Sequence, residues 1–260
     1  MSQTSIYLEA LGLLLAMMGL LWLVSVARRN ASIVDPFWGT TFVVAGWWYF
    51  VRTPGGDPGR KLLLMALVTV WGLRLSVYLL WRNWGQPEDP RYQAFRRRYG
   101  AERYWWVSFF QVFVLQGVLS WLIGAPLLGA QAGGGPLGWV DAVAVAVWLV
   151  GFVFEAGSDL QLARFRARRT SPDELLVDGF WRYTRHPNYF GDAACWWGYG
   201  LFAIAAGGWV SALGAVLMTA LIIKVSGVAL LERSLGSHKP GYAEYARRTS
   251  AFLPWPPRRG

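Results

Sequence analysis

The ten residues 183–192 place an unusual density of hydrogen-bonding groups at the start of an otherwise apolar segment. They read Tyr-Thr-Arg-His-Pro-Asn-Tyr-Phe-Gly-Asp and combine an arginine, a histidine, an amide, a carboxylate and two phenols. A helix that faces only lipid has no use for such groups. The stretch therefore predicts a site for a polar ligand. Its candidate contacts are Tyr183, Arg185, His186, Asn188 and Asp192.

A second group of charges lies at the end of the preceding apolar stretch. Glu155, Asp159 and Arg166 stand at i, i+4 and i+11, which places them on one face of a helix. One explanation is an interfacial helix whose acids pair with its own arginines. That explanation does not suit Glu155, because carboxylates so deep in an apolar run are normally functional or bonded to something specific.

The N-terminal half offers two further candidates, Asp35 and Tyr78. Asp35 directly precedes Pro36 and an apolar stretch, so a helix N-cap followed by proline is one interpretation. Tyr78 lies four residues after Arg74 and four before Arg82, so the three side chains form a polar stripe on a hydrophobic helix. Such a stripe is expected to face the interior of a helix bundle.

The elements that must position these side chains are membrane helices. The chain has 260 residues, 55% of them hydrophobic, with 17 Trp and a positive mean hydropathy. Seven stretches are long enough to cross ~30 Å of hydrocarbon at 1.5 Å per residue. They are residues 6–26, 33–51, 61–81, 108–130, 138–158, 190–206 and 209–231. The sequence thus predicts an all-α, polytopic integral membrane protein with seven transmembrane helices in one domain, residues 1–260.

The basic residues predict the orientation of this bundle. Of the 25 Lys and Arg residues, 20 follow the first, third, fifth or seventh stretch, and cytoplasmic loops retain such residues. We therefore expect the N-terminus outside, the C-terminus in the cytoplasm and a site that faces the cytoplasm from a bacterial inner membrane. The net charge of +10 does not indicate nucleic acid, because the cations are spread over separate loops and no soluble domain is left to carry a binding face.

Several familiar signatures are missing from the sequence. No Gly-x-Gly-x-x-Gly follows a strand and no Walker loop occurs, so a nucleotide must be held in another way. The two histidines, His186 and His238, and the single Cys195 do not make a metal cage, and there is no His-Glu-x-x-His. We expect no metal site.

Taken together, these motifs resemble the steroid 5-alpha-reductase family, in its bacterial branch of small membrane proteins. The resemblance rests on residues 185–198, on the Glu155, Asp159 and Arg166 face, and on the closing stretch 245–254. It is most specific over 140–254. Before that, residues 34–39 and the segment from Arg82-Asn83 to Glu88-Asp89-Pro90-Arg91-Tyr92 resemble the bacterial branch only.

The resemblance implies a seven-helix bundle that binds NADPH from the cytoplasm without a Rossmann fold. It implies adenosine and phosphate contacts at Asp159 and Arg166, and nicotinamide-side contacts at Asn188 and Asp192. From the tail it adds Tyr245 and Arg247 or Arg248. Glu155 stands where eukaryotic members have asparagine. The family also uses an acid on span two and a tyrosine on span three to activate the substrate, for which Asp35 and Tyr78 are the positional candidates here.

The expected reaction is the NADPH-dependent saturation of an enone in a lipophilic substrate that enters from the bilayer, foremost a 3-oxo-delta4-steroid. Isoprenylcysteine-type methyltransferases are a rival, because they also resemble Arg-His-Pro-x-Tyr-x-Gly followed by a glutamate and a Tyr-x-x-Tyr tail. They use S-adenosylmethionine, which lacks phosphates and gains little from the arginines of residues 164–169. A noncatalytic scaffold or transporter is a third alternative. Membrane lipids are expected partners, and a monomer is compatible with the sequence.

Overall fold

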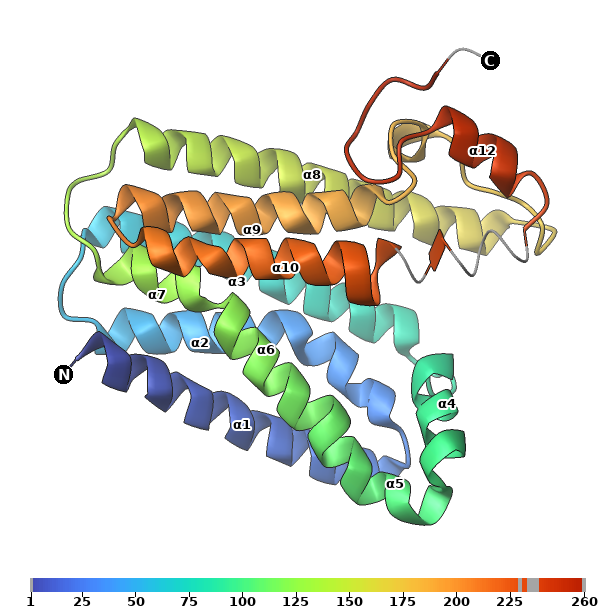
Figure 1. Cartoon of the computed structure of the whole chain (residues 1–260), viewed down its shortest axis with the longest axis horizontal. Helices are drawn as coiled ribbons and strands as arrows, with labels where there is room; N and C mark the ends of the chain where they lie inside the picture. The colour runs from blue at the N-terminus through green and yellow to red at the C-terminus, as the bar shows by residue number, and fades with distance from the viewer. Residues whose placement is uncertain (1, 229–230, 233–238, 259–260) are drawn as a thin grey trace. The chain divides into compact units, whose positions relative to one another are not determined.

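The computed structural model describes residues 2–228, 231–232 and 239–258, so that Arg233 and His238 lie outside it (Figure 1). Throughout these residues the secondary structure is helical, apart from an isolated parallel β-bridge between Thr184 and Ser250. The predicted all-α class is confirmed. The chain packs into two compact units: unit 1 contains residues 1–137 and 203–211, and unit 2 contains 138–202 and 212–260.

Within the described residues, four helical stretches are long and apolar enough to cross a membrane, which indicates a membrane-embedded protein. They are α1 (Gln3–Arg28), α3 (Pro58–Asn83), the continuous stretch Ala101–Ala132 and α8 (Trp139–Arg168). The stretch Ala101–Ala132 comprises α5 (Ala101–Ser108), the π-helix η2 (Phe109–Val114), α6 (Leu115–Ile123) and α7 (Ala125–Ala132).

The other three predicted spans are also helical, but their helices are shorter than the four stretches above. One is α2 (Trp38–Arg52), and another is α9 (Pro187–Ala205). The last is built from the 3-10 helix η4 (Trp209–Ala212), α10 (Leu213–Leu221) and the π-helix η5 (Ile222–Ser226). Its predicted end includes residues 229–230, which lie outside the described part.

In unit 1 the backbone before α2 departs from the predicted helix. A 3-10 helix, η1 (Ala31–Phe37), contains Asp35 and Pro36, and Phe37 occupies the N-cap position of α2. Asp35 therefore does not cap α2. The short helix α4 (Pro90–Tyr99) is capped by Asp89, whose Oδ1 accepts a hydrogen bond from the Arg91 amide at 2.9 Å.

A buried cluster fixes α4 against the rest of unit 1. Tyr92 of α4 is 5% exposed and belongs to the same core as Met18 of α1, Val34 of η1 and Phe113 of η2. The hydroxyl end of Tyr92 is thereby held beside η1, the segment that carries Asp35. Apolar packing thus positions a polar pair.

In unit 2, α8 and α9 run side by side in antiparallel directions (Figure 1). Small residues allow the close approach: a Cβ on Gly191 would lie 2.4 Å from the amide nitrogen of Glu155, and one on Gly198 would lie 2.8 Å from the Trp148 Cβ. The indole of Trp148 donates a hydrogen bond to the Tyr199 hydroxyl at 2.9 Å. Glycine contacts of this kind are typical of helix pairs in membranes.

The C-terminal segment is held against the residues that precede α9. It contains α12 (Tyr242–Arg248) and the tail that follows it. The Arg185 amide donates to the Ser250 carbonyl at 2.9 Å, and the Trp255 amide donates to the Tyr183 carbonyl at 2.9 Å. The Thr184 hydroxyl donates to the Phe252 carbonyl, also at 2.9 Å. Residues 183–185 therefore anchor the tail.

Candidate functional site

The carboxylate of Glu232 gathers four donors in unit 2. Arg185 donates from Nε to Oε1 at 2.8 Å and from Nη2 to Oε2 at 2.9 Å. His186 Nε2 lies 2.8 Å from Oε1, and the Tyr242 hydroxyl donates to the same oxygen at 2.7 Å. We refer to Arg185, His186, Glu232 and Tyr242 as the Glu232 cluster.

Electrostatics fix the protonation state of this cluster. Burial alone would raise the pKa of Glu232, but hydrogen bonds from Arg185, Tyr242 and His186 outweigh burial and bring the pKa down to about 2. Burial lowers the pKa of His186 despite its contact with Glu232, so at neutral pH the imidazole is uncharged. Because the ionised carboxylate only accepts hydrogen bonds, the imidazole proton is assigned to Nε2, which leaves Nδ1 as an acceptor.

The remaining arm of Arg185 is also directed inward. Its Nη1 donates to the carbonyls of Ala246 at 2.9 Å and Thr249 at 2.6 Å, at the C-terminal end of α12. A guanidinium at a helix C-terminus satisfies carbonyls that have no partner within the helix. Arg185, predicted to contact a cofactor, thus holds the C-terminal segment in place, whereas His186, also predicted as a contact, bonds to Glu232.

Two other predicted contacts meet where α8 and α9 adjoin. Asn188 Nδ2 donates to Asp159 Oδ1 at 3.3 Å. Asp159 is 6% exposed, and Glu155, one turn earlier on α8, is 2% exposed. Asp192 lies one turn after Asn188 on α9 and is partly buried, whereas Arg166 lies near the exposed end of α8. The structure therefore joins Asp159 to Asn188 but leaves Arg166 near the surface.

A small pocket of about 180 Å³ opens near the charged end of α8. It is lined by Gln161, Arg164, Arg168, Leu176, Asp178 and Gly179. The backbone at Gly179 has a φ of 60°, a left-handed conformation that favours glycine. Arg164 and Arg168 are one turn apart on α8 and present two guanidinium groups to one pocket. Arg166 is not among the lining residues.

The predicted tail contacts lie elsewhere in unit 2. The Tyr245 hydroxyl donates to the Trp181 carbonyl at 2.5 Å, which attaches α12 to the segment before α9. Arg247 and Arg248 line a second pocket, of about 330 Å³, which shares no lining residue with the first. Tyr183 is 42% exposed.

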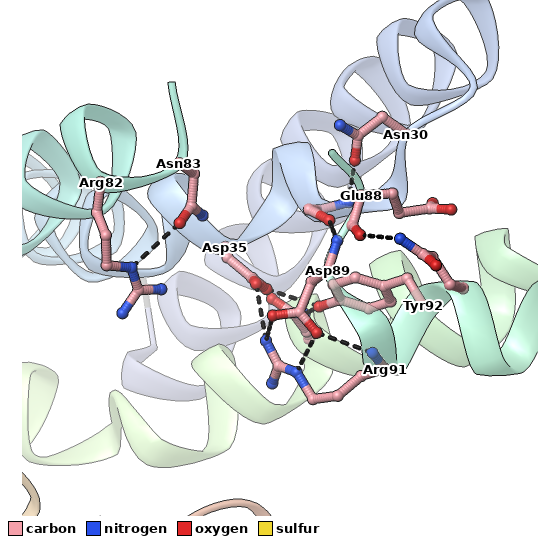
Figure 2. A network of polar contacts seen from close by, with 11 residues as sticks. Asn30, Asp35, Arg82, Asn83, Glu88, Asp89, Arg91 and Tyr92 are labelled. Atoms are coloured by element: carbon pink, nitrogen blue, oxygen red, sulfur yellow. Dashed lines mark hydrogen bonds and ion pairs between the residues drawn. The ribbon is translucent and has the colours of Figure 1, made fainter. Parts of the chain in front are cut away.

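In unit 1, Figure 2 shows Asp35 bonded to two residues of α4. The Tyr92 hydroxyl donates to Asp35 Oδ1 at 2.6 Å, and Arg91 Nη2 donates to Oδ2 at 2.9 Å. The Tyr92 oxygen also accepts a hydrogen bond from Gln116 Nε2 at 3.3 Å. The tyrosine bonded to Asp35 is therefore Tyr92. Tyr78, the expected partner, lies on α3 with the Arg82 guanidinium 5.8 Å from its ring centre.

A second layer of ionic contacts supports this pair. Glu88 accepts two hydrogen bonds from Arg96, at 2.8 and 3.0 Å, and one from the Ala31 amide at 2.7 Å. The Ser32 hydroxyl accepts from the Asp89 amide at 2.6 Å. The segments around Asp35 and 88–92, 57 positions apart in the chain, are thereby joined along η1 (Figure 2).

Burial raises the pKa of Tyr92, and the charge of Asp35 raises it further. Tyr92 therefore keeps its proton throughout the physiological pH range. In this state the hydroxyl serves as a hydrogen-bond donor or as a general acid, and not as a base.

The Glu232 cluster and the contacts of Asp35 both lie within the part of the chain that matches one protein family. The family described as "Protein of unknown function (DUF1295)" matches residues 21–249, a range that includes Asp35, Tyr92 and Glu232. The chain belongs to the DUF1295 family. It is 27% identical over 277 residues to the "Uncharacterized protein C594.04c" of Schizosaccharomyces pombe, which covers 94% of this chain and 78% of the relative. No solved structure matches the chain at a significant level.

Sequence reasoning missed several side chains that organise these clusters of the DUF1295 chain. They are Glu88, Arg91, Tyr92, Glu232 and Tyr242. A signal existed for each. The run Glu88-Asp89-Pro90-Arg91-Tyr92 contributed to the family resemblance, and Glu232 with the Tyr-x-x-Tyr tail contributed to the rival one.

Proposed function

We propose that this DUF1295 protein is an NADPH-dependent membrane reductase that saturates the C=C bond of an enone in a lipophilic substrate, with a 3-oxo-delta4-steroid as the first candidate. The observation that carries the proposal is the pocket lined by Arg164, Arg168 and Asp178. Two guanidinium groups one turn apart suit a phosphate, and a carboxylate suits ribose hydroxyls. The resemblance of residues 140–254 to steroid 5-alpha-reductases supports the same assignment.

The donor set fits the phosphorylated end of NADPH. Whole drug-sized ligands occupy pockets of roughly 300–1,000 Å³. The pocket of about 180 Å³ therefore suits a ribose phosphate rather than a whole dinucleotide. The further contacts in the proposal, Asp159, Asn188 and Asp192, lie on α8 and α9 of the same unit. Bound NADPH would supply hydride to the carbon beta to the substrate carbonyl, and a proton from solvent or a side chain would then add to the alpha carbon and complete the saturation.

The protein's own task would be to stabilise negative charge on the carbonyl oxygen. We assign this to Tyr92 in place of Tyr78, because Tyr92 is the tyrosine bonded to Asp35. A phenol has one proton, so donation to a substrate requires the hydroxyl to turn away from Asp35. Arg91, 2.9 Å from the other carboxylate oxygen, would keep the charge of Asp35 compensated during that turn. Tyr92 would then donate its hydrogen bond to the substrate oxygen, while Arg91 balances the charge of Asp35.

The proposal includes the full membrane topology. Seven spans, with the N-terminus outside and the C-terminus in the cytoplasm of a bacterial inner membrane, agree with the distribution of basic residues. In this arrangement a lipophilic substrate enters from the bilayer while the charged cofactor binds from the cytoplasm.

A second candidate is an S-adenosylmethionine-dependent methyltransferase of the isoprenylcysteine type. The Glu232 cluster favours it, because Arg185, His186, Glu232 and Tyr242 belong to the motifs that resemble those enzymes. S-adenosylmethionine has no phosphate and would make no use of the two arginines in the α8 pocket.

Ligand-induced thermal shifts of the purified chain in detergent distinguish the candidates. NADPH, NADH and S-adenosylmethionine are compared at equal concentration, and stabilisation grows as RT ln(1 + [L]/Kd), about 2.7 kcal/mol at a hundred times Kd. We expect the largest shift with NADPH and none with S-adenosylmethionine. A shift with S-adenosylmethionine alone would reverse the assignment, and no shift with any of the three would remove a nucleotide from the function.

A further inference from the structure

The second pocket of unit 2, about 330 Å³ in volume, is built by the C-terminal segment. Its lining includes Arg185, Arg247, Arg248, Trp255 and Arg258. We refer to it as the tail pocket. Its volume lies within the range of small-ligand sites.

The tail pocket carries uncompensated positive charge. Arg185 is neutralised by Glu232. Arg248 lies 3.7 Å from Glu244, an exposed pair of little strength. Within the part of the chain that the structure describes, Arg247 and Arg258 have no acidic partner. The pocket therefore presents a net excess of two cations, which calls for an anionic ligand.

The backbone of the tail pocket is braced before any ligand binds. The Arg258 amide donates to the Arg248 carbonyl at 2.9 Å, and the Trp255 amide is bonded to Tyr183. The Thr184 hydroxyl is also hydrogen-bonded to the carbonyls of Ala251, a lining residue, and of Phe252. A site with its backbone already ordered loses less entropy when it binds.

Apolar side chains beside the cations indicate an amphiphile. Trp255, which lines the tail pocket, is 71% exposed, and Leu253, two residues earlier and outside the lining, is 64% exposed. A free phosphate gains nothing from such groups, whereas tryptophan is enriched at the level of lipid headgroups and arginines there attract anionic lipids. Residues 183–185, which anchor the tail, lie two residues before the start of α9 at Pro187, and α9 packs along the membrane-length helix α8.

We propose that the tail pocket binds the headgroup of an anionic phospholipid, with the phosphate between Arg247 and Arg258 and with Leu253 and Trp255 against the upper acyl chains. The site is separate from the cofactor site of the proposed function and stands without it. It would fix the C-terminal segment to the membrane surface.

The test measures lipid binding by the full chain, purified in detergent and stripped of lipid. Dioleoyl phosphatidylglycerol is compared with dioleoyl phosphatidylcholine by native mass spectrometry, and sodium phosphate is added as a competitor. We expect phosphatidylglycerol to bind at least 10-fold more tightly. Arg247→Gln with Arg258→Gln should lower that affinity roughly 10- to 30-fold and leave phosphatidylcholine binding unchanged.

The matched control is Arg97→Gln with Arg98→Gln, two exposed arginines of α4. Equal losses in this control would mean nonspecific attraction and would overturn the site. If sodium phosphate displaces all bound phosphatidylglycerol when the lipid is present below its saturating concentration, the pocket is a site for free phosphate instead. Loss of the NADPH thermal shift with unchanged lipid binding would assign the arginines to the cofactor. Trp255→Ala keeps the charges of the pocket and should still weaken the binding of phosphatidylglycerol. This variant tests the proposal even if the double arginine variant does not fold.

Discussion

At the scale of single residues, the hydroxyl proton of Tyr92 is the group on which the proposed chemistry depends. Tyr92→Phe removes that proton and keeps the buried ring, so the core around Met18 and Phe113 should persist. We expect kcat/KM for an enone to fall about 10²–10³-fold, as for the loss of one oxyanion donor, while NADPH affinity stays constant.

Tyr78→Phe is the matched control for this measurement, since it makes the same change on α3. Steady-state kinetics on both variants decide between the two tyrosines. A large loss of kcat/KM in Tyr78→Phe with normal turnover in Tyr92→Phe would favour the pair of Asp35 and Tyr78 that was expected from sequence position. The Asp35–Tyr92 hydrogen bond would then have a structural role only.

A second prediction at this scale concerns the arginines of the α8 pocket. Replacing Arg164 and Arg168 together with Gln should weaken NADPH binding by about 10-fold or more, because two charge-assisted hydrogen bonds to phosphate are lost. NADH, which lacks the 2′-phosphate, should be affected much less. Dissociation constants for both cofactors provide the measurement. Arg166→Ala is the control, because Arg166 lies between these two arginines on α8 and does not line the pocket. Equal losses of affinity for NADPH and NADH would mean that this pocket does not bind the 2′-phosphate.

Sequence reasoning identified polar groups more readily than their partners. It singled out Asp35, Arg185 and His186 because such side chains are costly in an apolar chain. It did not predict that Tyr92 reaches Asp35 across 57 positions, nor that Glu232 takes up the donors of Arg185. Those contacts depend on how helices pack over long separations, and neither spacing nor local propensity contains that information.

At the scale of elements, the approach of α8 to α9 rests on Gly191. A methyl group there would lie 2.4 Å from the Glu155 amide nitrogen and 2.5 Å from the Gly151 carbonyl oxygen, both of them backbone atoms that cannot move alone. Gly191→Ala should therefore cost roughly 1–3 kcal/mol through overpacking. The apparent Tm in detergent provides the measurement, with Gly12→Ala on α1 as the control, because a Cβ there meets nothing within 4 Å. Equal Tm values for the two variants would show that the helices can separate at no cost.

Predictions of elements succeeded where hydrophobicity is continuous. The stretches 6–26 and 61–81 are the centres of α1 and α3. The helix predicted from Glu155 to Arg166, beyond the apolar run, is confirmed, because α8 continues to Arg168. The predicted boundary was wrong where proline intervenes: the predicted helix 33–51 begins only at Trp38. Hydrogen bonds between Ala31, Ser32 and residues 88–89 stabilise the 3-10 helix that replaces its start. Those contacts belong to tertiary structure.

At the scale of the whole molecule, the Glu232 cluster makes stability depend on pH. The folded pKa of Glu232, about 2, lies below its ordinary value of 4.5, so its contribution is present above 4.5 and is lost as pH falls towards 2. His186 has the same sign, because its pKa lies below its ordinary 6.5 and the unfolded chain takes up the proton first. We expect the apparent Tm to fall progressively from pH 7 to pH 3.

Glu232→Gln provides the comparison for this profile. The variant should melt at a lower temperature at pH 7, because an ionised acceptor of four donors has become a neutral amide. Below pH 4.5 its curve should be flatter than that of the wild type. Parallel curves between pH 5 and pH 3 would mean that other carboxylates cause the acid sensitivity.

The anchoring of the tail by Arg185 also implies a delay during biosynthesis, between the synthesis of Arg185 and that of the residues it binds. The carbonyls that receive its guanidinium belong to residues 61 and 64 positions further along the chain. At a synthesis rate of about 5–20 residues per second, the ribosome needs roughly 3–13 s to deliver them after Arg185 has been made. Throughout that interval Arg185 lacks the two carbonyls that later accept its hydrogen bonds. The nascent chain therefore presents a cationic segment to the insertion machinery and to quality-control proteases until α12 emerges.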